Sequence, residues 1–202
     1  MSRTLTLPLA RLLGELAEAA AVVAGVPVTV AVVDGEAGLV YLARMDDALP
    51  ASRDLAVAKA QTAASLRMAT AEVGRLAQPD APLYGIQHVQ PGRIVLFGGG
   101  LPLRLAGRVV GGLGVSGGTV EEDVRIASSV VEALVEMERW AGVVERSAPP
   151  GHANGHGPTH IEPALRAAFS GMDPPLPARE QSILAGAVVL GLAATPDRAA
   201  KV

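Results

Sequence analysis

Cysteine is absent from this chain of 202 residues. Its absence excludes disulfide bonds, thiolate metal sites, iron–sulfur clusters and cysteine nucleophiles. Aromatic residues make up only 2% of the sequence, which excludes the rows of stacked rings that bind single-stranded nucleic acid. The formal net charge of -3 at pH 7 also argues against a nucleic-acid partner, because phosphate backbones require a basic surface. The expected partner is therefore a small molecule or another protein.

Long hydrophobic runs are also missing. The longest late run, residues 183–194, is shorter than the roughly 20 residues that a membrane-spanning helix needs. Residues 1–7 lack the basic segment, apolar run and cleavage site of a secretory signal. We therefore expect a cytoplasmic protein with no membrane partner.

The apolar residues, 50% of the chain, follow clear helical periodicities in its first part. Leucine and alanine recur at helical spacing over residues 8–24, and Gly25 is typical of a helix C-terminal cap. An alanine-rich stretch at 52–69 predicts a second helix. Thr119 and Glu122 have the spacing of a capping box, which predicts the start of another long helix.

Five short runs rich in β-branched and apolar residues predict strands at 28–33, 39–45, 94–97, 101–105 and 109–116. Short loops between the runs favour hairpins, and hairpins make an antiparallel sheet. The expected fold class is therefore α+β, a five-stranded antiparallel sheet with helices packed on it.

Nine glycines lie between Phe97 and Gly118, interleaved with the last two predicted strands. Glycine weakens a strand, so it usually persists where a bulge, a bend or another group's close approach leaves no room for a Cβ atom. We expect a ligand, a helix or a neighbouring subunit to lie against this backbone.

The chain divides by composition into three parts. Residues 1–145 carry the helical and strand patterns of one domain. Residues 146–160 are rich in proline, glycine and histidine and are typical of a flexible linker. Residues 161–202 predict a short helical tail, too small to fold alone, which would dock back, join an oligomer or bind another protein.

Several motifs in register resemble the GlcG/HbpS family, which also includes the C-terminal domain of PduO. They are Gly25-x-Pro27-Val28-Thr29-Val30-Ala31-Val32-Val33-Asp34, Arg44-Met45-Asp46, Lys59-Ala60-x-Thr62-Ala63, Gly99-Gly100-x-Pro102 and Gly111-Gly112-Leu113-Gly114-Val115-Ser116-Gly117-Gly118. The resemblance covers about residues 5–142. It implies a profilin-like domain of α/β/α layers with a five-stranded antiparallel sheet, assembly into homo-oligomers and, for some members, haem as ligand.

A haem ligand would need an iron-coordinating side chain. Haem iron in proteins takes His, Met, Tyr or Cys, and in this domain the choice is His88, Met45, Met68, Tyr41 or Tyr84. Haem-binding relatives that use a histidine of the first helix have no counterpart here, because residues 8–24 contain none. His88 is the candidate iron ligand, and an exposed loop histidine is the alternative.

Six further residues form the candidate ligand-binding set: Arg44, Lys59, Asp34, Ser116, Gly117 and Gly118. Arg44 and Lys59 remain protonated near neutrality and suit a carboxylate or a haem propionate. The amides of Ser116, Gly117 and Gly118 precede a helix and suit an anion. The alternatives are an intrachain ion pair for Arg44 and a turn-stabilising role for Asp34.

The leading hypothesis is an oligomeric ligand-binding protein of the GlcG/HbpS type that holds haem or a small anionic metabolite. One alternative is a microcompartment- or enzyme-associated protein that binds a partner through its C-terminal helices. Another is a small-molecule enzyme of unknown reaction using Asp34, Lys59 or Ser116. We expect no dedicated metal site: three histidines at 152, 156 and 160 lie in the linker, where an adventitious metal site is the alternative to plain linker.

Overall fold

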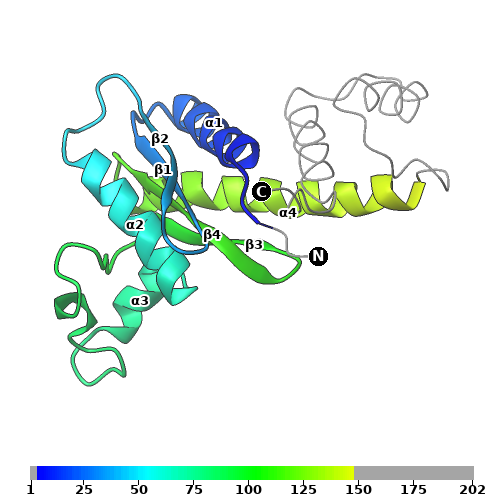
Figure 1. Cartoon of the computed structure of the whole chain (residues 1–202). Coiled ribbons are helices and arrows are strands. Elements are labelled where there is room, and N and C mark those ends of the chain that lie inside the picture. The colour runs from blue at the N-terminus through cyan, green and yellow to red at the C-terminus, as the bar shows by residue number, and fades with distance from the viewer. Residues whose placement is uncertain (1–3, 148–202) are drawn as a thin grey trace, which may run out of the picture. The chain divides into compact units, whose positions relative to one another are not determined.

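The computed structural model describes residues 4–147 (Figure 1). The predicted linker and tail therefore lie outside the described residues, except for residues 146 and 147, which continue the last helix. The elements in chain order are α1 (Leu7–Ala24), β1 (Thr29–Asp34), β2 (Leu39–Arg44), α2 (Ser52–Leu66), α3 (Thr70–Leu76), the short 3₁₀ helix η1 (Ile86–His88), β3 (Gly100–Leu105), β4 (Arg108–Ser116) and α4 (Val120–Ser147).

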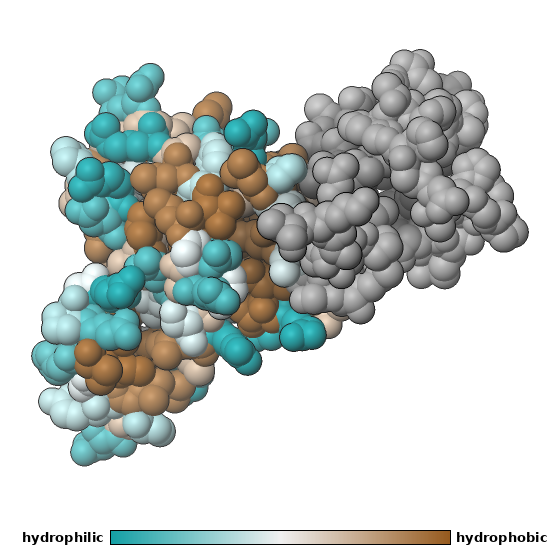
Figure 2. Space-filling view, viewed as in Figure 1, coloured by the Kyte–Doolittle hydropathy of each residue, from teal (hydrophilic) through white to brown (hydrophobic). Residues whose placement is uncertain are grey.

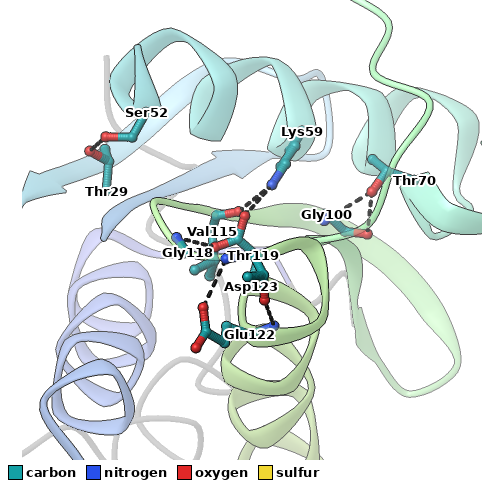
Figure 3. A network of polar contacts seen from close by, with 10 residues as sticks. All are labelled: Thr29, Ser52, Lys59, Thr70, Gly100, Val115, Gly118, Thr119, Glu122 and Asp123. Carbon is teal, nitrogen blue, oxygen red and sulfur yellow. Dashed lines mark hydrogen bonds and ion pairs between the residues drawn. The ribbon is translucent and has the colours of Figure 1, made fainter. Parts of the chain in front are cut away.

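Local sequence signals account for the helix ends. At the start of α1, the Thr6 side chain accepts a hydrogen bond from the backbone N–H of Leu9, and Gly25 ends the helix in the left-handed region at φ 68°. At the start of α4, Thr119 and Glu122 exchange hydrogen bonds as a capping box (Figure 3). The C-terminal cap at Gly25 and the capping box at Thr119 and Glu122, both predicted from the sequence, are confirmed. Among the described residues, no helix is both long and apolar enough to cross a membrane.

The sheet has four strands in the order β2-β1-β4-β3, and all neighbours are antiparallel. The α+β class and the antiparallel sheet are confirmed, but the prediction of a fifth strand at 94–97 is wrong. That segment lies along α2 instead, where the backbone N–H of Val95 donates to Thr62 Oγ1 at 3.0 Å. The Thr62 hydroxyl thus accepts the hydrogen bond that the Val95 N–H would have donated to a neighbouring strand in a sheet.

The sheet lies between two helical layers. Figure 3 shows α2 on one face and α1 with the first turns of α4 on the other. Alternate residues of β1 divide between the two faces, as expected for a strand buried on both sides. Ala31 and Val33 pack with alanines of α2. The opposite face is buried through larger side chains, among them Leu9, Leu13, Val30, Val32, Leu113 and Ile126.

Two glycines of β4 explain how closely α2 approaches the sheet. A Cβ atom at Gly114 would lie 2.0 Å from the carbonyl oxygen of Ala56, and one at Gly112 would lie 2.2 Å from that of Ala60. Both contacts are with helix backbone, which cannot rotate away. The close approach predicted from the glycine-rich sequence is therefore that of α2, whose small alanine side chains leave its backbone against the strand.

The substitution Gly114→Ala tests this packing. We expect a loss of about 1–3 kcal/mol in the free energy of unfolding, because the new methyl group overpacks the contact between α2 and β4. Urea unfolding followed by circular dichroism measures the loss. Gly35→Ala is the matched control, since a Cβ atom there meets nothing closer than 3.6 Å. Equal stabilities of the two variants would contradict the packing argument.

Candidate functional site

A buried ion pair joins α2 to α4 at the end of β4. The Nζ atom of Lys59 lies 2.6 Å from Oδ2 of Asp123 and donates to the carbonyl oxygen of Val115 at 2.9 Å (Figure 3). The Lys59 side chain is fully buried and that of Asp123 is 4% exposed. Lys59 comes from the alanine-lined side of α2 that faces the sheet, which explains its burial.

The second carboxylate oxygen of Asp123 holds the glycine-rich strand end. Its Oδ1 accepts the backbone N–H of Gly118 at 3.1 Å. The capping box at Thr119 and Glu122 starts α4 there and turns Asp123, in the first helical turn, toward both Gly118 and Lys59 (Figure 3). The anion niche predicted around Gly117 and Gly118 thus holds a carboxylate of the chain itself.

Burial dominates the titration of both partners. It lowers the pKa of Lys59 and raises the pKa of Asp123, while their hydrogen bond and mutual attraction oppose each shift. A raised carboxyl pKa contributes stability at low pH that is lost as pH rises through it, and a lowered ammonium pKa contributes stability at high pH that is lost as pH falls through it. Because burial opposes the charged form of each partner, the net contribution of the pair to stability is small compared with the cost of removing one partner alone.

Variants of the pair test that conclusion. Lys59→Met or Asp123→Leu alone should cost about 3–5 kcal/mol in the free energy of unfolding, because each leaves a buried charge without its partner. The double variant should recover most of the loss, since an apolar pair has no charge to desolvate. Urea unfolding of all four proteins at neutral pH gives this cycle. A double variant as unstable as the sum of the single losses would contradict the argument.

The other members of the predicted ligand-binding set lie elsewhere. Arg44 is exposed at the end of β2, where its guanidinium donates to the carbonyl oxygen of Ala48. Asp34 ends β1, and its Oδ1 accepts the backbone N–H groups of Glu36 at 3.0 Å and Gly38 at 2.8 Å. The turn-stabilising alternative for Asp34 is therefore confirmed.

The structure brings together only part of that set. Lys59, Gly118 and, at the end of β4, the buried Ser116 lie near one another, whereas Arg44 and Asp34 lie at opposite ends of the β1–β2 hairpin. Asp123, which links Lys59 to the glycines, was missed from the sequence. The sequence held only part of the signal, a lysine among alanines that needed a partner and an acidic residue directly after the capping box, but 64 residues separate the two.

A hollow of about 390 Å³ lies between α2 and the segment that was predicted as a fifth strand. Its walls are mostly apolar and are made by Asp54, Leu55, Ala58, Gln87, Gly92, Ile94, Val95, Leu96 and Phe97. The ring of Phe97 also lies 5.1 Å from the Nζ atom of Lys59, a cation–π distance that connects the hollow to the buried pair. Sequence reasoning missed this hollow because it arises from the segment's unexpected path.

One polar atom in the wall of the hollow lacks a partner. The Oε1 atom of Gln87 is buried and makes no hydrogen bond, which is costly for an amide oxygen. The Nε2 atom of Gln87 lies 3.3 Å from Nε2 of the neighbouring exposed His88. The hollow therefore offers apolar walls, and the exposed imidazole of His88 adjoins Gln87 in its lining.

The remaining candidate iron ligands differ in availability. The Tyr41 hydroxyl donates to Glu18 Oε1 at 2.7 Å, and burial together with this hydrogen bond raises the Tyr41 pKa to about 12. Tyr41 therefore stays protonated at neutral pH, which disfavours it as a tyrosinate ligand. Met45 and Met68 are half-buried, and Tyr84 is exposed.

The raised pKa of Tyr41 predicts a loss of stability in alkali. Because the folded-state pKa exceeds the ordinary value, the hydrogen bond to Glu18 contributes fully below pH 10.0 and is lost as pH rises to about 12. Melting temperatures of the wild type should fall over this interval more steeply than those of Tyr41→Phe. Tyr84→Phe, which alters a side chain of a residue 67% exposed, should follow the wild type. Parallel curves for the wild type and Tyr41→Phe would overturn the prediction.

Comparison with known proteins identifies the family. The family model described as "Haem degrading protein HbpS-like" matches residues 5–132. The chain belongs to the HbpS-like family. A 15.0 kDa protein from the dhaT-dhaS intergenic region of Citrobacter freundii is 44% identical over 134 residues, which span 66% of this chain and 94% of the relative.

Two solved structures are also similar to this chain. One is described as a PduOC:heme complex, with 40% identity and a TM-score of 0.62 over 64% of this chain and 94% of that one. The other is a double mutant of HbpS from Streptomyces reticuli, with 33% identity and a TM-score of 0.60 over 66% of this chain and 89% of that one. The resemblance stated from the sequence motifs is thereby confirmed.

Proposed function

We propose that this HbpS-like chain binds haem. The observation that carries the proposal is its likeness to the PduOC:heme complex, at 40% identity over 94% of that chain. The description of the matching family model, which names haem degradation, supports the same ligand.

The hollow beside α2 suits part of a porphyrin. Its apolar walls, including Leu55, Ile94 and Phe97, match an apolar ring face, and its volume lies at the lower end of the roughly 300–1,000 Å³ typical of small-molecule pockets. A porphyrin held there would keep one edge outside the hollow.

His88 is the proposed iron ligand. It is the one histidine among residues 4–147, and its neighbour Gln87 lines the hollow. Bound haem would supply an iron that takes such an axial ligand. Within residues 4–147 the hydrogen-bonding partner of the exposed imidazole is the side chain of Gln87, at 3.3 Å, and this single contact leaves the ring able to reorient toward iron.

The pairing of Lys59 and Gly118 with Asp123 argues against a small anionic metabolite and in favour of haem. Asp123 already neutralises Lys59 and accepts the Gly118 amide, so a metabolite carboxylate would have to displace a carboxylate of the chain. The set of Arg44, Lys59, Asp34, Ser116, Gly117 and Gly118 as ligand-binding residues remains a prediction. The partner-binding tail also remains a prediction, since it lies outside the described residues.

Titration of the purified full chain with haem, followed by absorbance, tests the proposal. We expect a Soret band that saturates at a fixed ratio of haem to chain. His88→Ala should shift that band and weaken binding by about tenfold or more, equivalent to about 1.4 kcal/mol. Both effects are expected because the variant lacks the imidazole that would coordinate the haem iron.

A variant with His152, His156 and His160 all changed to alanine is the matched control, because these histidines lie outside the domain that resembles the haem complex. It should bind haem as the wild type does. Absence of a saturable Soret band in the wild type would remove haem as the ligand. An unchanged band in His88→Ala would keep haem but remove His88 from the iron.

A further inference from the structure

The hollow beside α2 has one acidic residue in its wall, Asp54, and an arginine already pairs with it. Arg53 Nε donates to Asp54 Oδ1 at 2.9 Å, and Arg53 Nη2 donates to Oδ2 at 3.4 Å. The hydrogen bond from Arg53 lowers the pKa of Asp54, so this carboxylate is ionised at neutral pH. The pair therefore brings no net charge to the rim of the hollow, and two nitrogens of Arg53 are engaged.

A second arginine, Arg93, lies at the same hollow. Its neighbours on both sides, Gly92 and Ile94, line the hollow, and Arg93 itself is exposed. Within the part of the chain that the structure describes, the Arg93 guanidinium makes no hydrogen bond or ion pair. Arg93 is also the one lysine or arginine in the segment 77–97. It therefore places an uncompensated positive charge beside apolar walls.

A tight turn fixes the backbone of Arg93. Its N–H donates to the carbonyl oxygen of Gln90 at 3.0 Å, and Gly92 has a φ of 77°. Proline followed by glycine suits the centre of a type II turn, because Pro91 presets its own φ and Gly92 accepts a positive φ. The carbonyl oxygen of Arg93 lies 3.0 Å from the hydroxyl of Thr62 in α2. Such anchoring on both sides lowers the entropy lost when the side chain binds a ligand.

Haem combines an apolar ring with anionic propionates on one edge, and an anionic edge is best met by a cation. The sequence predicted Arg44 and Lys59 for this role. Lys59 is fully buried against Asp123, and Arg44, at the end of β2, is outside the lining of the hollow. Neither predicted cation therefore serves a propionate at the hollow, whereas Arg93 is placed to do so.

We propose that Arg93 binds a propionate of haem held in the hollow, an inference that rests on the proposed function. A guanidinium can donate two parallel hydrogen bonds to one carboxylate, which fixes direction as well as charge. Asp54 repels the same propionates from the α2 side of the hollow. Attraction by Arg93 and repulsion by Asp54 together favour one orientation of the ring, with its anionic edge on the side of Arg93.

Absorbance titrations of the full chain with haem and with haem dimethyl ester, whose propionates carry no charge, test this contact. Arg93→Gln should weaken haem binding about threefold to fivefold, the effect of losing an exposed ion pair, and leave binding of the ester unchanged. The wild type should bind the ester more weakly than haem. Arg108→Gln is the matched control, because it removes the same charge from an exposed arginine at the start of β4, outside the lining of the hollow.

Equal haem affinities of the wild type and Arg93→Gln, with a saturable Soret band in both, would overturn the role of Arg93 and leave haem binding standing. An equal loss for haem and its ester would assign Arg93 to the shape of the hollow and remove it from the propionate. Absence of a saturable Soret band in the wild type would remove the proposed function and this contact with it. Equal affinities of the wild type for haem and its ester would also overturn the contact, and this comparison decides even if Arg93→Gln fails to fold.

Discussion

The direct contact between the backbone of α2 and strand β4 is the constraint from which the rest of this domain follows. Gly112 and Gly114 have no side chains to separate β4 from α2. The residues of α2 that face them are alanines, among them Ala56 and Ala60. Helix and sheet therefore approach more closely than larger side chains would allow. Dense packing of this kind compensates for a core with few aromatic rings, because many small contacts replace a few large ones.

That close contact also explains why a lysine is buried at the centre of the domain. A helix lying so near the sheet gives the Lys59 side chain no route to solvent, so it must find its partners inside. Asp123 and the carbonyl oxygen of Val115 supply them. The glycines near the pair serve the same end, since a Cβ atom at Gly99 would lie 2.7 Å from Nζ of Lys59. Glycine-rich strand ends that suggest ligand binding in the sequence thus make room for an internal ion pair.

The features that depend on residues close together in the sequence could be predicted from it. The helix at α1, the β1–β2 hairpin and the capping box at Thr119 follow from short-range patterns, and the structure confirms each. The glycines predicted a close approach but not which group approaches. The partner of Lys59 could not be predicted, because 64 residues separate it from Asp123 and only the packing of α2 brings them together. The segment 94–97 has strand-like composition, but Thr62 binds its backbone, and composition does not report such a tertiary contact.

The wrong prediction of a fifth strand bears directly on function. Had residues 94–97 paired with β3, they would have covered the β3 edge, and their side chains would have lain along the sheet. They run beside α2 instead, and Phe97 is placed both against Lys59 and in the wall of the hollow. The buried pair therefore holds one wall of the proposed haem site through Phe97.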